Sequence, residues 1–183
     1  MEITMHTHIF SFEPLHVRHA AELHDALLDE RLYHFIPEQP PRSLASLEAQ
    51  FNEFATGAPV GSGEVWLNWV IREQSSQSCV GMLQATCFAS NELWIGYKVV
   101  PAWWGRGIAT SGLTWLLGEL AILFPGQSVF ASVDTRNLAS VCVLAKCGFT
   151  LLRQEPAELH GERTEEYIYY LPSCSPIPFR NRL

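Results

Sequence analysis

The chain has 183 residues, 48% hydrophobic and 17% charged, which is enough for one hydrophobic core of ordinary size. Its formal net charge is −7, and Lys98 and Lys146 are the only lysines, so no basic stripe is available to hold a nucleic-acid backbone. The five cysteines form no Cys-x-x-Cys pair, and their odd number argues against a disulfide framework.

The N-terminal segment lacks the basic start and apolar run of a signal peptide, and no stretch of about 18 apolar residues occurs in the chain. We therefore expect a cytoplasmic protein with no nucleic-acid or membrane partner.

The first half of the chain reads as a strand, two helices and a meander of antiparallel strands. Residues 8–13 form the expected first strand, and apolar residues recur at near-helical spacing over residues 15–35. Ser43 can cap a helix over residues 44–56. From Glu64 the period changes to the alternation of strands, which we place at residues 64–72, 79–88 and 93–100.

The second half alternates helices and strands. We expect a helix over residues 108–123, a strand over 128–134 and a short helix from Asn137 that Gly148 closes in a left-handed conformation. Two last strands, 150–154 and 164–171, flank an acidic turn. One domain is expected over residues 1–171, followed by a loose proline-rich tail over 172–183.

The stretch "PAWWGRGIAT", residues 101–110, places two glycines directly before an apolar helix. A strand, a glycine turn and a helix start form an anion site, because unpaired N–H groups point outward and the helix dipole adds partial positive charge. Gly105 and Gly107 let the backbone approach a phosphate, and Arg106 can add a charged contact. The spacing fits neither a P-loop nor a Gly-x-Gly-x-x-Gly loop.

The segment "YKVVPAWWGRGIAT", followed about 27 residues later by "NLASVCVLAKCGF", resembles the acetyl-CoA-binding core of the GNAT superfamily of N-acetyltransferases. It is most similar to the branch of ribosomal-protein alanine and serine acetyltransferases. The resemblance implies an α+β, GNAT-like acyl-CoA N-acyltransferase fold, with a mixed, mostly antiparallel central sheet flanked by helices.

Positions in this sequence take expected roles from that resemblance. Val99 would bond the acetyl carbonyl through its backbone, Asn137 would contact the pantetheine arm, and Ser140 would protonate the leaving thiolate. Trp104 stands where the family often has glutamine or arginine, so backbone amides must carry more of the binding. The residues expected to cradle the pyrophosphate are Trp104, Gly105, Arg106, Gly107, Ile108, Ala109 and Thr110.

Removing the amine proton calls for a carboxylate, and the acidic segment "AELHGERTEEY" resembles the family's turn before the last strand, which makes Glu158 the expected general base. Tyr33 and Phe35 belong to the segment that covers the acceptor in relatives, and His160 adjoins the base, so these three are expected to contact substrate. The other carboxylates considered are Glu92, Glu155, Glu162, Glu165 and Glu166.

No metal is expected, because His6 and His8 have no third ligand at suitable spacing, and Cys142 and Cys147 are expected in the core. The sequence thus predicts an acetyl-CoA-dependent N-acetyltransferase in which a primary amine attacks directly in a ternary complex. The acceptor is either a protein N-terminus or a small-molecule amine, and the protein a monomer or homodimer. The alternative is a non-catalytic CoA-binding sensor or regulatory module.

Overall fold

The computed structural model describes residues 10–172, and a mixed seven-stranded sheet in the order β1-β2-β3-β4-β5-β7-β6 forms its centre. The β4–β5 pair is parallel and the other neighbouring pairs are antiparallel. The predicted mixed, mostly antiparallel sheet is therefore confirmed. The strands are β1 (Phe10–Pro14), β2 (Val65–Glu73), β3 (Cys79–Cys87), β4 (Leu93–Val99), β5 (Val129–Asp134), β6 (Thr150–Leu159) and β7 (Glu162–Leu171).

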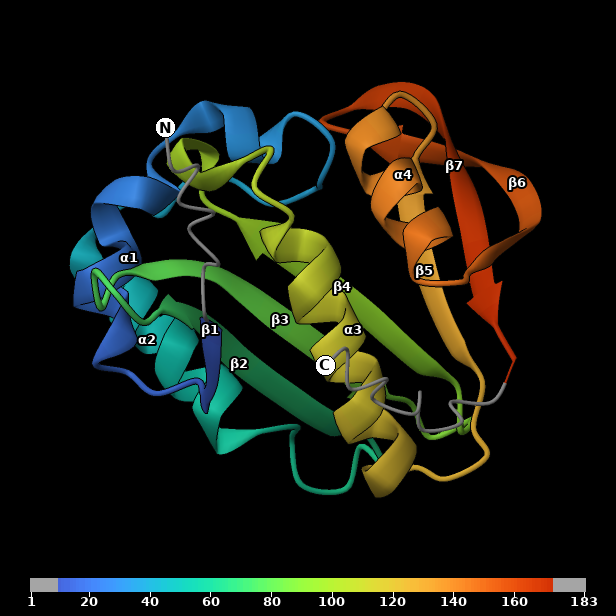
Figure 1. The fold of residues 1–183 in the computed structure, drawn as a ribbon, viewed down its shortest axis with the longest axis horizontal. Helices are drawn as coiled ribbons and strands as arrows, with labels where there is room; N and C mark the ends of the chain where they lie inside the picture. Colours follow the sequence, from blue (N-terminus) through green and yellow to red (C-terminus); the bar gives the residue numbers. More distant parts are fainter. Residues whose placement is uncertain (1–9, 173–183) are drawn as a thin grey trace, which may run out of the picture.

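Helices cover both faces of the sheet. On β2, Asn68 donates from Nδ2 to the carbonyl of Phe54 in α2, whereas Ile71 lies against α3. Because side chains three residues apart on a strand point to opposite faces, α2 and α3 lie on opposite sides. Figure 1 shows α3 and α4 on the same side. The helical segments are α1 (His19–Leu27), η1 (Glu30–Tyr33), α2 (Leu44–Thr56), η2 (Pro101–Trp103), α3 (Ile108–Leu123) and α4 (Leu138–Lys146).

Helix α3 lies close to the sheet because Gly112 faces it. A Cβ at Gly112 would lie 3.0 Å from Cδ1 of Ile71 and 3.2 Å from Cδ2 of Leu83. Leu113, Leu116 and other apolar residues of the helix are buried in the core beside these strands. This packing fixes the N-terminus of α3 beside the C-terminal end of β4.

Two predicted boundaries are wrong. The single helix expected over residues 15–35 ends at Leu27, and the 3₁₀ segment η1 follows because the Asp29 side chain accepts from the Arg31 N–H and starts a new turn. The acidic segment expected as a turn is mostly strand: only His160 and Gly161 turn the chain, with φ of 53° and 82°. Two successive left-handed residues make a tight hairpin that lets β6 and β7 continue.

Part of the first predicted strand, His6, His8 and nearly all of the expected tail over 172–183 lie outside the described residues. No helix within residues 10–172 has the length and apolar character needed to cross a bilayer.

Candidate active site

Strands β4 and β5 separate soon after they meet. Their parallel pairing is confined to Leu93 with Val129 and Trp94 with Phe130. Beyond that point β4 runs on to its C-terminal end at Val99, and Figure 1 shows the two strands diverging. The divergence exposes one edge of β4 in the middle of the sheet.

The main chain of Val99 faces this opening. The neighbouring Val100 donates its N–H to the carbonyl of Val80 on β3 at 3.0 Å. Because main-chain groups alternate in direction along a strand, the N–H and carbonyl of Val99 point away from β3. The carbonyl accepts from Nε1 of Trp104 at 2.6 Å. The Val99 N–H is therefore directed toward the space between the diverging strands.

The glycine turn that follows β4 opens helix α3. Gly105 and Gly107 have φ of 75° and 77°, the left-handed region that glycine adopts without penalty. Gly107 is the N-cap residue of α3 and has no side chain to bond the free amides. The first hydrogen bond of the helix runs from the N–H of Ser111 to the carbonyl of Gly107, so the N–H groups of residues 108–110 have no partner within the helix.

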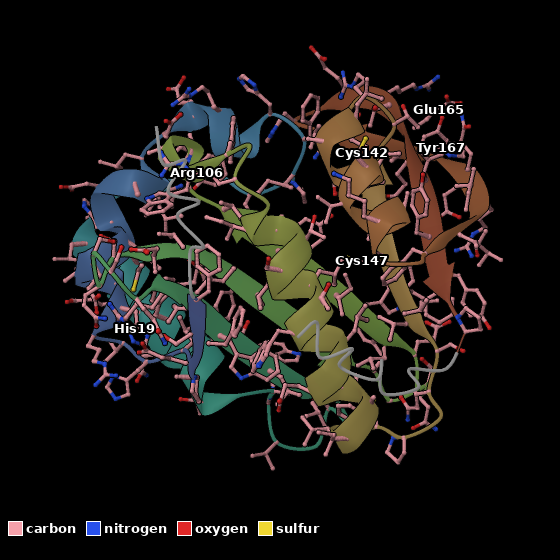
Figure 2. The ribbon with its side chains drawn as sticks, viewed as in Figure 1. His19, Arg106, Cys142, Cys147, Glu165 and Tyr167 are labelled. Atoms are coloured by element: carbon pink, nitrogen blue, oxygen red, sulfur yellow. The ribbon has the colours of Figure 1, made fainter. Side chains whose placement is uncertain are left out.

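Trp104, which stands where the family often has glutamine or arginine, has a structural role in this turn. Its indole bonds the carbonyl of Val99 and so ties the glycine turn to the end of β4. The guanidinium of Arg31 lies 5.7 Å from the Trp104 ring centre but is paired with the Asp29 carboxylate at 2.6 Å. The guanidinium of Arg106 lies 4.5 Å from the Trp103 ring centre and supplies positive charge beside the turn. Figure 2 shows Arg106 beside this turn. The turn thus combines free amides with positive charge, which suits a pyrophosphate.

Asn137 and Ser140 stand together at the start of α4. The Asn137 Oδ1 accepts from the Ser140 N–H at 3.1 Å and caps the helix. The Ser140 Oγ lies 2.7 Å from the hydroxyl of Tyr97 on β4. Burial raises the pKa of Tyr97 to about 12, with the Ser140 hydrogen bond acting in the opposite direction.

Tyr97 is not among the residues expected from the sequence, although one signal pointed to it. It lies two residues before Val99 and so shares its face of β4. Its contact with Ser140, 43 residues later, depends on how α4 packs.

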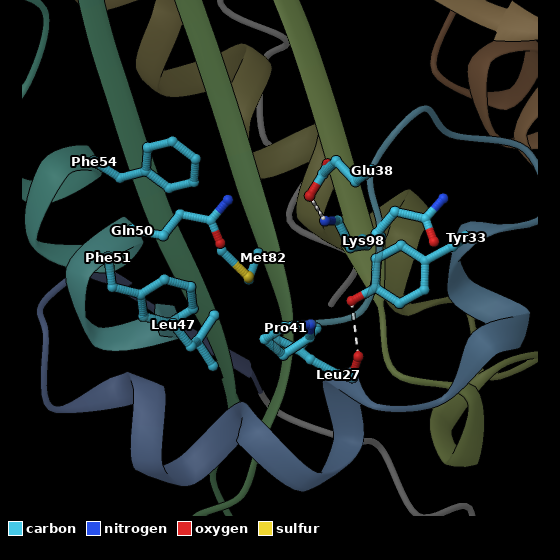
Figure 3. Close-up of a pocket in the computed structure, with 11 residues that line it drawn as sticks. Leu27, Tyr33, Glu38, Pro41, Leu47, Gln50, Phe51, Phe54, Met82 and Lys98 are labelled. Carbon is cyan, nitrogen blue, oxygen red and sulfur yellow. Dashed lines mark hydrogen bonds and ion pairs between the residues drawn. The ribbon is translucent and has the colours of Figure 1, made fainter. Parts of the chain in front are cut away.

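On the opposite face of the sheet, a small pocket lies between the α1–α2 segment and strands β3 and β4 (Figure 3). Glu38 and Lys98 form an ion pair at 2.6 Å on its wall. The Tyr33 hydroxyl donates to the Leu27 carbonyl at 2.8 Å, and burial raises the pKa of Tyr33 to about 12. The ring of Tyr33 thus lines the pocket while its hydroxyl is used within the fold.

The predicted acceptor residues lie near one another. Nε2 of His160, at the β6–β7 turn, is 2.9 Å from the Tyr33 carbonyl, and its Nδ1 is 2.9 Å from Nε2 of Gln39. Phe35 is partly exposed and lies 5.9 Å from the guanidinium carbon of Arg136, which follows β5. The β6–β7 hairpin thereby closes against the α1–α2 segment.

The carboxylates considered as bases occupy different environments. Glu158 is exposed on the outermost strand, β6, opposite Arg163 on β7. Glu92 is exposed before β4, 3.4 Å from Nε1 of Trp94. Glu166 is partly buried, and burial followed by the charge of Glu155 raises its pKa.

The possible metal ligands and the two cysteines of the α4 region were also considered in the sequence. Within residues 10–172, no three His, Cys, Asp or Glu side chains are grouped to hold a metal ion. Both Cys142 and Cys147 come from the α4 region (Figure 2). Cys142 is exposed, so its expected place in the core is wrong, because it lies on the outer side of this short helix; Cys147 is partly buried against the core.

The fold and the opening between β4 and β5 define an acyl-CoA N-acyltransferase architecture. The family model for the acetyltransferase (GNAT) domain matches residues 10–150. The chain therefore belongs to the GNAT acetyltransferase family, and the predicted family, fold and enzyme class are confirmed. A comparison with curated proteins finds no match.

Several solved structures are similar in fold. The Salmonella typhimurium acetyltransferase that modifies the N-terminal serine of ribosomal protein L7/L12 is 19% identical, with a TM-score of 0.77 over 91% of this chain and 95% of that one. Mycobacterium smegmatis RimJ, in complex with CoA-disulfide, is 22% identical, with a TM-score of 0.77 over 90% and 82%. Vibrio cholerae spermidine N-acetyltransferase, with CoA and spermine, is 15% identical, with a TM-score of 0.72 over 90% and 95%.

Proposed function

We propose that this protein transfers the acetyl group of acetyl-CoA to a primary amine by direct attack in a ternary complex, in the cytoplasm and without a metal. The observation that carries the proposal is the divergence of β4 and β5, with the Val99 N–H directed into it and the α3 amides at one end. Such an opening can hold a thioester while leaving its carbonyl accessible from the opposite face.

The cosubstrate binds along this opening. Its pyrophosphate accepts hydrogen bonds from the amides of residues 105–110, with Arg106 adding charge at the rim, whereas the Trp104 N–H already donates to the Pro101 carbonyl at 3.1 Å. Asn137 uses its side-chain oxygen as the α4 cap, so its amide nitrogen faces the pantetheine arm. These contacts place the thioester between Val99 and Ser140.

The reaction needs a polarised carbonyl and a protonated leaving group. The nitrogen of a neutral amine attacks the thioester carbon while the Val99 N–H stabilises the charge that develops on the carbonyl oxygen. The carbon–sulfur bond then breaks, its electron pair stays on sulfur, and the Ser140 hydroxyl supplies the proton. The products are the acetylated amine and CoA with a free thiol.

The amine must first lose a proton, since an alkyl ammonium has an ordinary pKa near 10. Glu158 takes this role in our proposal, through water, because it lies one residue from the buried Leu159 and two from His160 at the hairpin that closes on the α1–α2 segment. Tyr33, Phe35 and His160 contact the acceptor.

For the acceptor, the pocket favours a protein N-terminus over a polyamine. Among the described residues that line the pocket, Glu38 is the one carboxylate, and its charge is paired with Lys98. A second ammonium group of a polyamine would therefore find no unpaired carboxylate there. Among the similar structures, both kinds of enzyme occur, modifying either a ribosomal-protein N-terminal serine or spermidine.

Loss of thioester absorbance on mixing the protein with acetyl-CoA and a panel of amines tests this function. Peptides beginning with serine or alanine should become acetylated at the α-amine faster than spermidine, as mass spectrometry would show. Binding of CoA with no acetylation of any amine would favour the non-catalytic sensor instead. Sedimentation of the same protein would distinguish a monomer from a homodimer.

A further inference from the structure

Tyr97 presents a phenol to the residue that we assign to the leaving group. Its hydroxyl oxygen is 2.7 Å from Ser140 Oγ and 3.3 Å from the Ser140 carbonyl. The two residues come from β4 and from α4, which follows β5, so their hydrogen bond spans the opening between the diverging strands. In the proposed function, Ser140 Oγ and the Tyr97 hydroxyl therefore lie beside the thioester sulfur.

A serine hydroxyl alone is a poor proton source. Donation of its proton to sulfur would leave an alkoxide, which is far more basic than a phenolate, since a phenol has an ordinary pKa near 10. A phenol that donates to the serine oxygen replaces the missing proton at once and avoids the alkoxide. Tyr97 is at the right distance to do this.

We propose that Tyr97 is a positioning residue that acts through Ser140 as the second member of a proton relay to the leaving sulfur; this inference rests on the proposed function. As the carbon–sulfur bond breaks, the Ser140 proton moves to sulfur and the Tyr97 proton moves to Ser140 Oγ. The resulting phenolate takes a proton from solvent when CoA leaves. Before the carbon–sulfur bond breaks, the phenol orients the serine hydrogen toward the sulfur of bound acetyl-CoA.

The environment of Tyr97 supports this assignment. The side chain packs against the core, and the phenol, which is protonated at neutral pH at its ordinary pKa near 10, stays protonated in the fold because burial raises that pKa to about 12. The ring also shares a strand face with Val99, whose N–H polarises the carbonyl. Two residues of β4, two positions apart, would thus act on the breaking carbon–sulfur bond: Val99 on the carbonyl group, and Tyr97, through Ser140, on the sulfur.

The test is a double-mutant cycle of Tyr97→Phe and Ser140→Ala. Thioester loss should be followed directly, because Cys142 is exposed and would react with a thiol reagent. Tyr97→Phe is expected to lower kcat at least about tenfold while leaving CoA affinity unchanged, since general acids contribute a hundredfold or more. On the Ser140→Ala background the same change should alter kcat less than about twofold.

Tyr170→Phe is the matched control, because its hydroxyl bonds Ser128 outside the opening; this variant should keep the wild-type kcat. Acetyl-CoA hydrolysis without an amine is measured in parallel, since it breaks the same carbon–sulfur bond. If the wild type releases CoA but Tyr97→Phe is equally fast, or if the two changes are additive, Tyr97 has no relay role. No CoA release by the wild type, with amine or water, overturns the proposed function and the relay together.

Discussion

Because Gly107 has a left-handed backbone conformation, a substitution at this residue gives the most direct test that the glycine turn binds the cosubstrate. Its φ is 77°, and a Cβ built there has no atom within 4 Å, so Gly107→Ala creates backbone strain and no steric clash in the free protein. For a residue with a side chain, this conformation costs roughly 1–2 kcal/mol.

That strain has two possible outcomes. If the turn keeps its conformation, the free energy of unfolding falls by about 1–2 kcal/mol, and the added methyl faces the pyrophosphate. If the turn leaves the left-handed conformation, the free energy of unfolding stays unchanged, but the turn must return to the strained conformation when CoA binds. A cost of about 1–2 kcal/mol lowers affinity by about fivefold to thirtyfold, so calorimetry should show CoA binding weaker by about this factor in either case.

Gly118→Ala provides the control for this measurement. Gly118 lies inside α3, its φ is not positive, and a Cβ there also has no atom within 4 Å. Alanine should stabilise the helix by up to about 1 kcal/mol without changing CoA affinity. A folded Gly107→Ala protein with wild-type stability and wild-type CoA affinity would refute the assignment of the pyrophosphate site.

Three further outcomes are expected. Asn137→Ala should lower the free energy of unfolding by about 1 kcal/mol in urea titrations, because it removes the cap of α4. Arg72 bonds Glu13 at 2.5 Å and Glu22 at 2.7 Å and holds the pKa of both carboxyls below the ordinary 4.5, so their stabilising effect is present above pH 4.5 and is lost as the pH falls below it. Chemical denaturation across that range should show a shallower loss of stability for Arg72→Gln, and an unchanged slope would contradict this account. Glu158→Gln should lower kcat roughly a hundredfold with CoA affinity intact. The dependence of rate on pH is measured with two acceptor amines of different pKa: the rise in rate that stays at the same pH for both acceptors belongs to the enzyme and should disappear in the variant. A glutamine variant that keeps this rise and the wild-type rate would move the role to Glu92 or an ordered water.

Local signals in the sequence predicted the elements whose ends they mark. The bounds of α2 agree with the prediction because Ser43 caps it, and those of α3 agree because Gly107 precedes its first turn. The β6–β7 hairpin was mistaken for a longer acidic turn because its acidic side chains suggested solvent exposure. The exposed side chains in fact belong to the edge strand β6 and to its neighbour β7. The left-handed conformation of His160, which makes the turn tight, cannot be predicted from the residues beside it.

Within the candidate site, too, some groups are marked by a local sequence signal and others are not. Main-chain groups that bind an anion must lie at the end of an element, where the hydrogen-bond ladder stops, and glycines mark such an end in the sequence. A side-chain donor such as Tyr97 has no comparable mark, because its role depends on a partner 43 residues away that packing brings to 2.7 Å. For this reason ten consecutive residues are enough to predict a cosubstrate turn, and resemblance to a family is enough to propose Ser140 and Glu158, whereas Tyr97 is proposed only when the two sides of the opening are seen together.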